Sequence, residues 1–269
     1  MLISIITPTF NSENTIEKNV KSIIYQTYKN FEHIIIDNQS KDNTIDVINK
    51  IYRETNLIDS LHIISEPDKG IAEAFNKGIK NAKGEIIGIL NSDDRYFNDR
   101  IFQKVLEAFN DKETIFVHGD VYFDDPVYGS NIRRPLLCPV TTTMPYNHPT
   151  MFFRKEVYEK YGNFNEEFKY TMDYELIMRY EKKIPGFRNK GKYLKGEPIA
   201  VMHSGGASWK YELESIREYK NSLKEYGYWD FNAKKEYFFR IFRTRLKMIF
   251  GDLHLNFIVK LWRKNKWGN

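Results

Sequence analysis

The 269-residue sequence predicts an α/β fold in which helices cover both faces of a mainly parallel, twisted sheet. Short isoleucine-rich runs in the first part of the chain alternate with segments whose apolar residues recur at helical spacing. Crossovers between such strands place the strands parallel to each other. With 41% hydrophobic and 15% aromatic residues the chain can bury a substantial core, and its length fits one large domain or two small ones.

Four strands are expected in this first part, each short and bounded by polar or glycine-containing turns. They cover Leu2–Thr7, Phe31–Asp37, Leu61–Ser65 and Glu85–Leu90. Three helices are expected between them, because apolar side chains repeat there every three or four residues. The repeats are Ile16, Val20, Ile23 and Ile24, then Ile45, Ile48 and Tyr52, then Ile71, Phe75 and Ile79. Gly84 is placed to end the third helix.

Polar residues follow each predicted strand. They are Thr7, Pro8, Thr9 and Asn11 after the first, Asp37, Asn38, Gln39 and Ser40 after the second, Glu66, Pro67, Asp68, Lys69 and Gly70 after the third, and Ser92, Asp93 and Asp94 after the fourth. Each loop alone fits an ordinary turn or helix cap. The carboxyl ends of parallel strands, however, meet at one edge, where open α/β sheets bind ligands. A ligand site is therefore expected at this edge.

The adjacent aspartates Asp93 and Asp94 are the most informative part of this edge. Two neighbouring carboxylates at the end of a buried strand repel each other, so the pair is costly unless a cation or hydrogen-bond donors compensate it. A solvated turn is the alternative. The loop after the first strand lacks the glycines of a dinucleotide site, and Gly186–Tyr193 fits a phosphate loop only superficially. A divalent cation that bridges a nucleotide diphosphate fits the pair better.

Four segments of the chain resemble the inverting family 2 glycosyltransferases of the GT-A fold, a Rossmann-like fold. The segments are Ser4–Asn11, Ile34–Thr44, Glu66–Asp94 and His148–Arg179, in the family's order and spacing, and they span most of residues 1–210. The aspartate pair matches the family's DXD-like motif in its shortened Ser-Asp-Asp form. The resemblance implies one GT-A domain, in which residues 1–95 bind the nucleotide sugar and residues 96–210 bind the acceptor.

The resemblance also implies roles for single residues. The nucleotide-sugar set is Asp37 for the uracil ring, Thr7, Pro8 and Thr9 beside the base and ribose, Asp68 and Lys69 in the loop that completes the base pocket, and Asp93 for ribose and diphosphate. Asp94 would bind Mn²⁺ or Mg²⁺, and Asp173 would be the general base. The family often has Glu-Asp where this chain has Met172 and Asp173, which removes one carboxylate but keeps the base. A lone carboxylate is enough to take the proton of an attacking hydroxyl, although a helix N-terminal acid is the alternative for Asp173.

The remaining site predictions concern the metal shell and the acceptor. In resembling enzymes the stretch His203–Ser208 would sit over the donor diphosphate, and His203 would complete the metal shell or bond a phosphate. A hydrogen-bonded structural histidine is the alternative. His148, Arg154 and Tyr174 would face the acceptor, with core or surface packing as the alternative.

Charge is spread unevenly along the chain, whose formal net charge is +5. From Ala233 onward ten Lys and Arg face two acidic residues, a net of +8, while the part before it carries 31 basic and 34 acidic residues, a net of −3. In this tail one helical face carries Phe238, Ile241, Phe242, Leu246 and Ile249, another carries Arg240, Arg243 and Lys247, and Trp262 and Trp267 follow. Residues 211–269 are thus expected to form a basic amphipathic helical extension, whose part from about Ala233 onward binds an anionic membrane surface and does not build the catalytic site. Packing on the domain or a homo-oligomer is the alternative.

Together these features predict an enzyme that moves a hexose or N-acetylhexosamine from a nucleotide sugar, a UDP-sugar by the resemblance, to a hydroxyl of a saccharide acceptor. The subset with an alkyl residue before Asp-Tyr makes bacterial surface polysaccharide, where a polyprenyl lipid can carry the acceptor. The sequence shows no signal peptide or membrane span, so a cytoplasmic enzyme on the inner face of the membrane is expected. The single cysteine, Cys138, excludes an intramolecular disulfide. A sugar-phosphate nucleotidyltransferase and a nucleic-acid-binding protein remain as alternatives, although carboxylates at the sheet edge disfavour nucleic acid.

Overall fold

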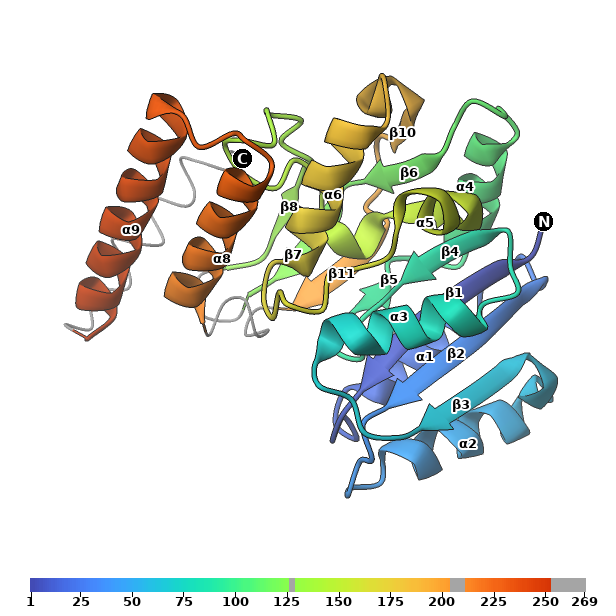
Figure 1. The fold of residues 1–269 in the computed structure, drawn as a ribbon. Helices are drawn as coiled ribbons and strands as arrows, with labels where there is room; N and C mark the ends of the chain where they lie inside the picture. Colours follow the sequence, from blue (N-terminus) through green and yellow to red (C-terminus); the bar gives the residue numbers. More distant parts are fainter. Residues whose placement is uncertain (126–128, 204–210, 253–269) are drawn as a thin grey trace.

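A computed structural model describes residues 1–125, 129–203 and 211–252 of the chain. The main sheet has seven strands in the order β10-β6-β9-β4-β1-β2-β3 (Figure 1). They are β1 (Ile3–Thr9), β2 (Phe31–Asp37), β3 (Leu61–Ser65), β4 (Ile86–Ile89), β6 (Phe116–Gly119), β9 (Phe152–Arg154) and β10 (Gly191–Leu194). β1 pairs in parallel with β2 and β4, whereas β9 runs antiparallel to β4 and β6. The predicted mainly parallel sheet is confirmed, and the four predicted strands coincide with β1 to β4 apart from their end residues.

Helices cover both faces of this sheet because consecutive isoleucines along its strands point to opposite faces and make both apolar. Ile6, Ile34 and Ile36 share one core cluster with α3 (Ile71–Asn81), α5 (Lys155–Tyr161) and α6 (Met172–Lys183). On the opposite face, Ile3 and Ile5 pack with α1 (Ile16–Ile24) and α4 (Ile101–Phe109), and α2 (Thr44–Glu54) packs beside α1. The three helices predicted between the first four strands are α1, α2 and α3. Figure 1 shows the arrows of β1, β2 and β3 pointing to the same edge of the sheet.

A second, four-stranded sheet lies at this edge, and the apolar pattern did not predict it. Its order is β5-β11-β7-β8, with β5 (Arg95–Tyr96), β7 (Val121–Asp124), β8 (Asn131–Arg133) and β11 (Ala200–His203). β5 begins directly after Asp94 and pairs antiparallel with β11, so Arg95 lies beside Val201. The second sheet therefore brings the end of β11 to the aspartate pair. Short 3-10 turns, η1 (Ile58–Ser60), η2 (His148–Thr150) and η3 (Phe187–Lys190), complete the domain.

Two helices follow the sheets, α8 (Glu212–Glu225) and α9 (Phe231–Asp252), and they lie side by side (Figure 1). α8 joins the main core through Tyr219 and Leu223. α9 is tied to α8 by a hydrogen bond from Thr244 to Glu212 of 3.0 Å and by an ion pair between Lys247 and Glu212. The predicted helical extension is confirmed for this part. The predictions for 204–208 and for Trp262 and Trp267 lie outside the described residues.

None of the helices in the described part of the chain has the length and apolarity that crossing a bilayer requires.

Candidate active site

A cavity of about 460 Å³ opens at the carboxyl edge of the main sheet. Six of the residues predicted from the sequence line it together: Asp93, Asp94, His148, Asp173, Tyr174 and His203. They come from the β4–β5 turn, from η2, from the start of α6 and from the end of β11. Parts of the chain that are far apart in sequence thus contribute the predicted metal, base and acceptor residues to one space.

The aspartate pair is held rigidly at the wall of this cavity. Asn19 of α1 donates through Nδ2 to the carbonyl oxygens of Asn91 and Asp94, at 2.8 and 3.0 Å. Asp94 is only 3% exposed. Burial, together with the negative charge of Asp93, raises the pKa of Asp94 well above its usual value, while hydrogen bonds from His203 and Asn91 oppose the rise. A buried carboxylate in this position is stabilised by a cation.

One ring nitrogen of His203 is fixed by the backbone beside the aspartate pair. Its Nδ1 lies 2.8 Å from the carbonyl oxygen of Asp93. Since a carbonyl can only accept, Nδ1 carries the proton, and Nε2 of the neutral ring keeps its lone pair. Nε2 lies 3.5 Å from Oδ2 of Asp124, an ion pair only when the ring is protonated. Metal-binding histidines are commonly fixed by a backbone carbonyl in this way.

The residues present fit a divalent cation that a diphosphate helps to hold. Mg²⁺ is usually bound through one or two carboxylates plus substrate phosphates. Within residues 1–125, 129–203 and 211–252, no group of three or more His, Cys, Asp or Glu side chains is close enough to hold a metal ion. Asp94 and His203 are the side chains that would contact the ion.

Asp173 lies in the first turn of α6, and its side chain is half-buried. Its Oδ1 accepts a hydrogen bond from the backbone N–H of Tyr174, at 2.8 Å, and the cavity lies open beside it. His148 is its ionisable neighbour. Burial lowers the pKa of His148, and the Asp173 carboxylate acts in the opposite direction. The ring of His148 stacks on Phe75 with 5.6 Å between the centroids, so the neutral imidazole forms a fixed wall beside the carboxylate.

Glu218 of α8, which the sequence did not single out, holds the loop in front of Asp173. Its carboxylate accepts backbone N–H groups of Lys169, Tyr170 and Thr171 at 2.9, 2.9 and 3.0 Å. The Thr171 hydroxyl donates to it as well, at 3.1 Å. These are the residues that lead into α6, so α8 fixes the start of the helix that carries the predicted base. Nothing in the local sequence indicates this contact, because the partners are 47 to 49 residues apart.

Glu218→Gln should lower the free energy of unfolding by about 1–3 kcal/mol. In the wild-type chain the loop donors share two carboxylate oxygens, whereas the glutamine amide has only one acceptor oxygen. Turnover should fall more than donor affinity, since the loop carries Asp173 and not the donor pocket. Urea unfolding and UDP titration measure the two effects. Glu214→Gln, an exposed change on the same helix, is the matched control. Wild-type stability and turnover in the Glu218 variant would show that the loop is held by other contacts.

Asp37 ends β2 inside a dense set of hydrogen bonds. It accepts from the hydroxyls of Thr9, Ser40 and Ser65, at 3.1, 2.5 and 2.7 Å, and from the backbone N–H of Ser40 at 3.1 Å. Its side chain is 1% exposed. Asp37 and Thr9 therefore shape the ends of β1 and β2. The predicted contact of Asp37 with uracil stays a prediction.

The other nucleotide-site residues divide into buried and accessible ones. Thr7 is fully buried, and its hydroxyl is bonded to His33 at 2.9 Å, so its side chain lies in the core and not at the edge. Pro8 and Asp68 are half-buried, and Lys69 is exposed. The backbone N–H of Asp68 donates to the side chain of Asn38 at 3.0 Å, which ties the third strand's loop to the second. The loops after β2 and β3 are therefore joined to each other at this edge of the sheet.

Phe10, which the sequence analysis did not select, stands at the end of β1 with 58% of its surface exposed. An exposed aromatic ring beside a ligand edge is a platform on which a nucleotide base can stack. The next residue, Asn11, has a φ of +49°, and Gln39 across the edge has a φ of +53°. Such conformations are costly for residues other than glycine and persist where contacts fix them. Here Asn11 accepts the backbone N–H of Lys41 at 2.8 Å.

One acceptor-side prediction needs correction. β9 runs antiparallel and pairs Arg154 with Ile86, at the beginning of β4, so Arg154 lies at the opposite edge of the sheet from the cavity. Its guanidinium donates to the carbonyls of Thr114 and Phe109, both at 2.8 Å, so Arg154 serves packing. Tyr174 lines the cavity, is 3% exposed, and donates through its hydroxyl to the carbonyl of Val140. Its predicted contact with the acceptor stays a prediction.

The tail from Ala233 onward reaches this cavity, although the sequence predicts that it does not build the catalytic site. Arg240 of α9 lines the cavity, as do Glu212, Ser215 and Tyr219 of the preceding helix α8. α9 moreover buries Ala233 and Tyr237, which are 2% and 7% exposed. The extension is therefore one wall of the cavity.

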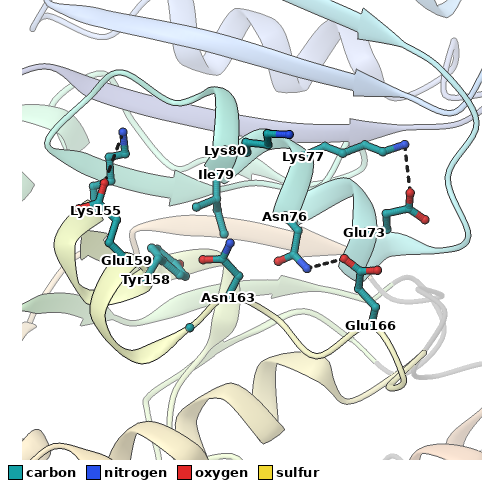
Figure 2. A pocket seen from close by; sticks show the side chains of 11 residues that line it. Glu73, Asn76, Lys77, Ile79, Lys80, Lys155, Tyr158, Glu159, Asn163 and Glu166 are labelled. Carbon is teal, nitrogen blue, oxygen red and sulfur yellow. Dashed lines mark hydrogen bonds and ion pairs between the residues drawn. The ribbon is translucent and has the colours of Figure 1, made fainter.

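A second hollow, of about 670 Å³, lies between α3 and α5, and Figure 2 shows its side chains. Its charged groups pair with one another, as in Lys77 with Glu73 at 3.4 Å and Lys155 with Glu159 at 3.7 Å. Asn76 donates to Glu166 at 2.8 Å. It is larger than the first cavity, but none of the predicted site residues lines it. The cavity at the strand ends therefore remains the candidate active site.

Comparison with known proteins points to one family. Residues 4–183 match the family model described as Glycosyl transferase family 2. An uncharacterised glycosyltransferase of Rickettsia typhi is 27% identical over 98% of this chain and 80% of its own length. The Escherichia coli UDP-Glc:alpha-D-GlcNAc-diphosphoundecaprenol beta-1,3-glucosyltransferase WfaP is 38% identical over 45% of this chain and 46% of that protein.

Solved structures share the fold. The crystal structure of S. aureus TarS 1–349 in complex with UDP-GlcNAc superposes with a TM-score of 0.65 at 19% identity, over 83% of this chain and 66% of that one. The mannosyltransferase PcManGT from Pyrobaculum calidifontis, in complex with GDP-Man and Mn²⁺, gives 0.59 at 19% identity, over 80% of this chain and 60% of that one. These likenesses confirm the GT-A-like α/β architecture. Because the family model covers residues 4–183 of the 269, the chain belongs to glycosyl transferase family 2 and is a glycosyltransferase that uses a nucleotide sugar.

Proposed function

We propose that the chain transfers a hexose or N-acetylhexosamine from a UDP-sugar to a hydroxyl of a saccharide acceptor, with inversion at the anomeric carbon, during synthesis of a surface polysaccharide. One observation carries this proposal: the aspartate pair Asp93–Asp94 and the separate carboxylate of Asp173 line the same cavity. The aspartate pair suits a metal-bound diphosphate, and the separate carboxylate of Asp173 suits a proton acceptor. WfaP is named for a UDP-Glc donor and a TarS structure contains UDP-GlcNAc, and both support uridine as the base.

The residues of the chain act at two points of the reaction. Asp173, with no other carboxylate in its turn except the buried Glu175, accepts the proton of the attacking hydroxyl. The ring of His148, whose pKa burial lowers, lies beside it. Asp93 orients the ribose and diphosphate. When bound at Asp94 and His203, a Mn²⁺ or Mg²⁺ ion supplies Lewis-acid stabilisation of the negative charge on the leaving diphosphate.

The test of this assignment is a panel of nucleotide sugars incubated with the full chain and Mn²⁺, in which release of nucleoside diphosphate is followed. We expect release from a UDP-sugar, which stops when EDTA removes the metal. Release of pyrophosphate from a nucleoside triphosphate plus a sugar phosphate would instead identify a nucleotidyltransferase. The absence of release from every nucleotide sugar, with and without acceptor, would contradict the proposal.

We place the acceptor on a lipid and the enzyme on the cytoplasmic face of an anionic membrane, through α9. The large apolar side chains of this helix face outward. Phe231, Phe238, Phe239, Phe242, Met248 and Ile249 are 80%, 65%, 56%, 60%, 51% and 50% exposed. The stripe Tyr237, Arg240 and Thr244 packs inward. Lys234 and Lys235, both exposed, add positive charge beside the apolar face, and the whole tail is strongly basic. An anionic bilayer matches both properties.

Phe238→Ser combined with Phe242→Ser should remove vesicle binding and leave UDP release from the donor unchanged. Each phenylalanine that leaves the apolar phase costs about 1.5–3 kcal/mol, so the two together should weaken partition by about 10²-fold or more. Sedimentation with anionic vesicles at low and high salt measures this. Tyr25→Ser, at an equally exposed aromatic residue outside α9, is the control. If the intact chain does not bind anionic vesicles at low salt, or if the double variant changes only the oligomeric state, the apolar face of α9 is a protein interface.

A further inference from the structure

Arg240 brings a positive charge to the cavity. Its Nη1 atom is buried and has no hydrogen-bond partner in the described part of the chain, although the guanidinium also forms a hydrogen bond with the side chain of Tyr219. The guanidinium lies over the ring of Tyr219, with its central carbon 4.4 Å from the ring centroid. No ion pair joins it to a carboxylate among the described residues, although Asp93, Asp94 and Asp173 line the same cavity. A buried donor on a charged group is costly to leave unpaired, so an anionic partner from outside the chain is indicated.

Ring contacts link Arg240 to the helix that carries the predicted base. Tyr219, under the guanidinium, packs against Tyr174 with 4.8 Å between the ring centroids, and Tyr174 follows Asp173 in α6. In a displacement with inversion, the base and the leaving diphosphate lie on opposite sides of the anomeric carbon. An anion bound at Arg240 is then part of the acceptor, while the donor diphosphate lies at Asp93 and Asp94.

The chemistry of the guanidinium specifies the anion. Arginine can bind a phosphate through two parallel N–H groups of its guanidinium. In Arg240, Nη1 could supply one of them and a second guanidinium nitrogen the other. Arg240 also lies on the inward side of the helix whose outward side is apolar. If the apolar side of α9 lies on a membrane, the lipid headgroups are close to α9. A phosphate at that level could then enter the cavity and contact Arg240.

We propose that Arg240 binds the phosphate or diphosphate that links the acceptor saccharide to its lipid. This inference rests on the proposed transfer to a lipid-linked saccharide. It adds that the enzyme reads the anionic linkage itself, so a neutral glycoside of the same sugar is a poorer acceptor.

The experiment compares two soluble probes on the full chain, each present with saturating UDP and Mn²⁺ so that the donor site is filled. One probe is N-acetylglucosamine joined through diphosphate to an alkyl chain, and the other carries the same sugar and alkyl chain without the diphosphate. Calorimetric titration gives the affinity of each. The wild-type chain should bind the diphosphate probe about 10- to 100-fold more tightly, the range expected for hydrogen bonds to a charged group.

Arg240→Gln should remove this difference, and Arg240→Lys should keep part of it, while UDP affinity stays at the wild-type value. Arg245→Gln, an exposed change on the same helix, should leave the difference intact. Equal affinity of the wild-type chain for both probes would overturn the inference, as would an Arg240→Gln variant that keeps the preference or loses affinity for both probes alike. A loss of UDP affinity in that variant would also overturn it, because the anion would then be the donor diphosphate. If the wild-type chain fails to bind UDP with Mn²⁺, the proposed function fails instead.

Discussion

Asp173→Asn should lower the rate of sugar transfer by on the order of 10²-fold or more, while the affinity for the donor stays similar. The amide keeps the shape of the side chain and its contact with the N–H of Tyr174, but it cannot accept the proton of the attacking hydroxyl. The half-buried side chain borders the cavity, so the substitution disturbs little packing. Steady-state transfer kinetics and UDP titration separate turnover from donor binding.

The control for this prediction addresses the alternative that Asp173 only stabilises a helix. Asp46 is the acid in the first turn of α2, exposed and away from the cavity. Asp46→Asn should cost a few tenths of a kcal/mol up to about 1 kcal/mol of stability through the helix dipole and leave transfer unchanged. If Asp173→Asn behaves in the same way, or if it loses donor binding while turnover persists, Asp173 is a structural acid and the base must be sought elsewhere in the cavity.

Asp94→Ala should abolish metal-dependent UDP binding and nearly all transfer. Asp94 is the buried member of the aspartate pair, and removing it takes away the carboxylate that would contact the metal. The fold should persist, because the neighbouring backbone is held by Asn19 and because a buried carboxylate with a raised pKa adds little stability of its own. Titration of UDP with and without Mn²⁺, next to thermal unfolding, measures both effects.

Two comparisons sharpen the prediction for Asp94. Asp94→Asn preserves the shape of the buried side chain, so it separates loss of charge from the cavity that alanine leaves. Asp99→Ala removes an exposed carboxylate from the same region and should have no effect. Unchanged activity in both Asp94 variants would exclude this residue as a metal contact.

The central sheet could be predicted because its first strands are contiguous isoleucine-rich runs joined by helices with a clear apolar period. The second sheet could not be predicted in this way. β5 has two residues and β8 has three, too few to show an alternation, and their pairing with β11 and β7 depends on segments far away in the chain. β9 is equally short, and its antiparallel direction is what moves Arg154 to the wrong edge for catalysis.

The candidate site was predictable where a residue type and a strand end coincide. Asp93 and Asp94 lie in the turn after β4, His203 ends β11, and all three line the same cavity. Glu218 and Arg240 could not be found, because their importance arises only when α8 and α9 fold back against the cavity. For α9 the period predicts two faces correctly, but which face packs inward depends on the partner surface. Here the basic stripe with Arg240 packs against Tyr219, and the phenylalanines remain outside.

The most direct test of the account is the anomeric configuration of the newly formed glycoside. The full chain would be incubated with Mn²⁺, an α-linked UDP-sugar and the alkyl-diphosphate N-acetylglucosamine acceptor, and the coupling constant of the new anomeric proton would be read by NMR. Direct displacement assisted by one carboxylate, Asp173, predicts a β-linked product. An α-linked product, or UDP release that never yields a glycoside, would contradict that mechanism.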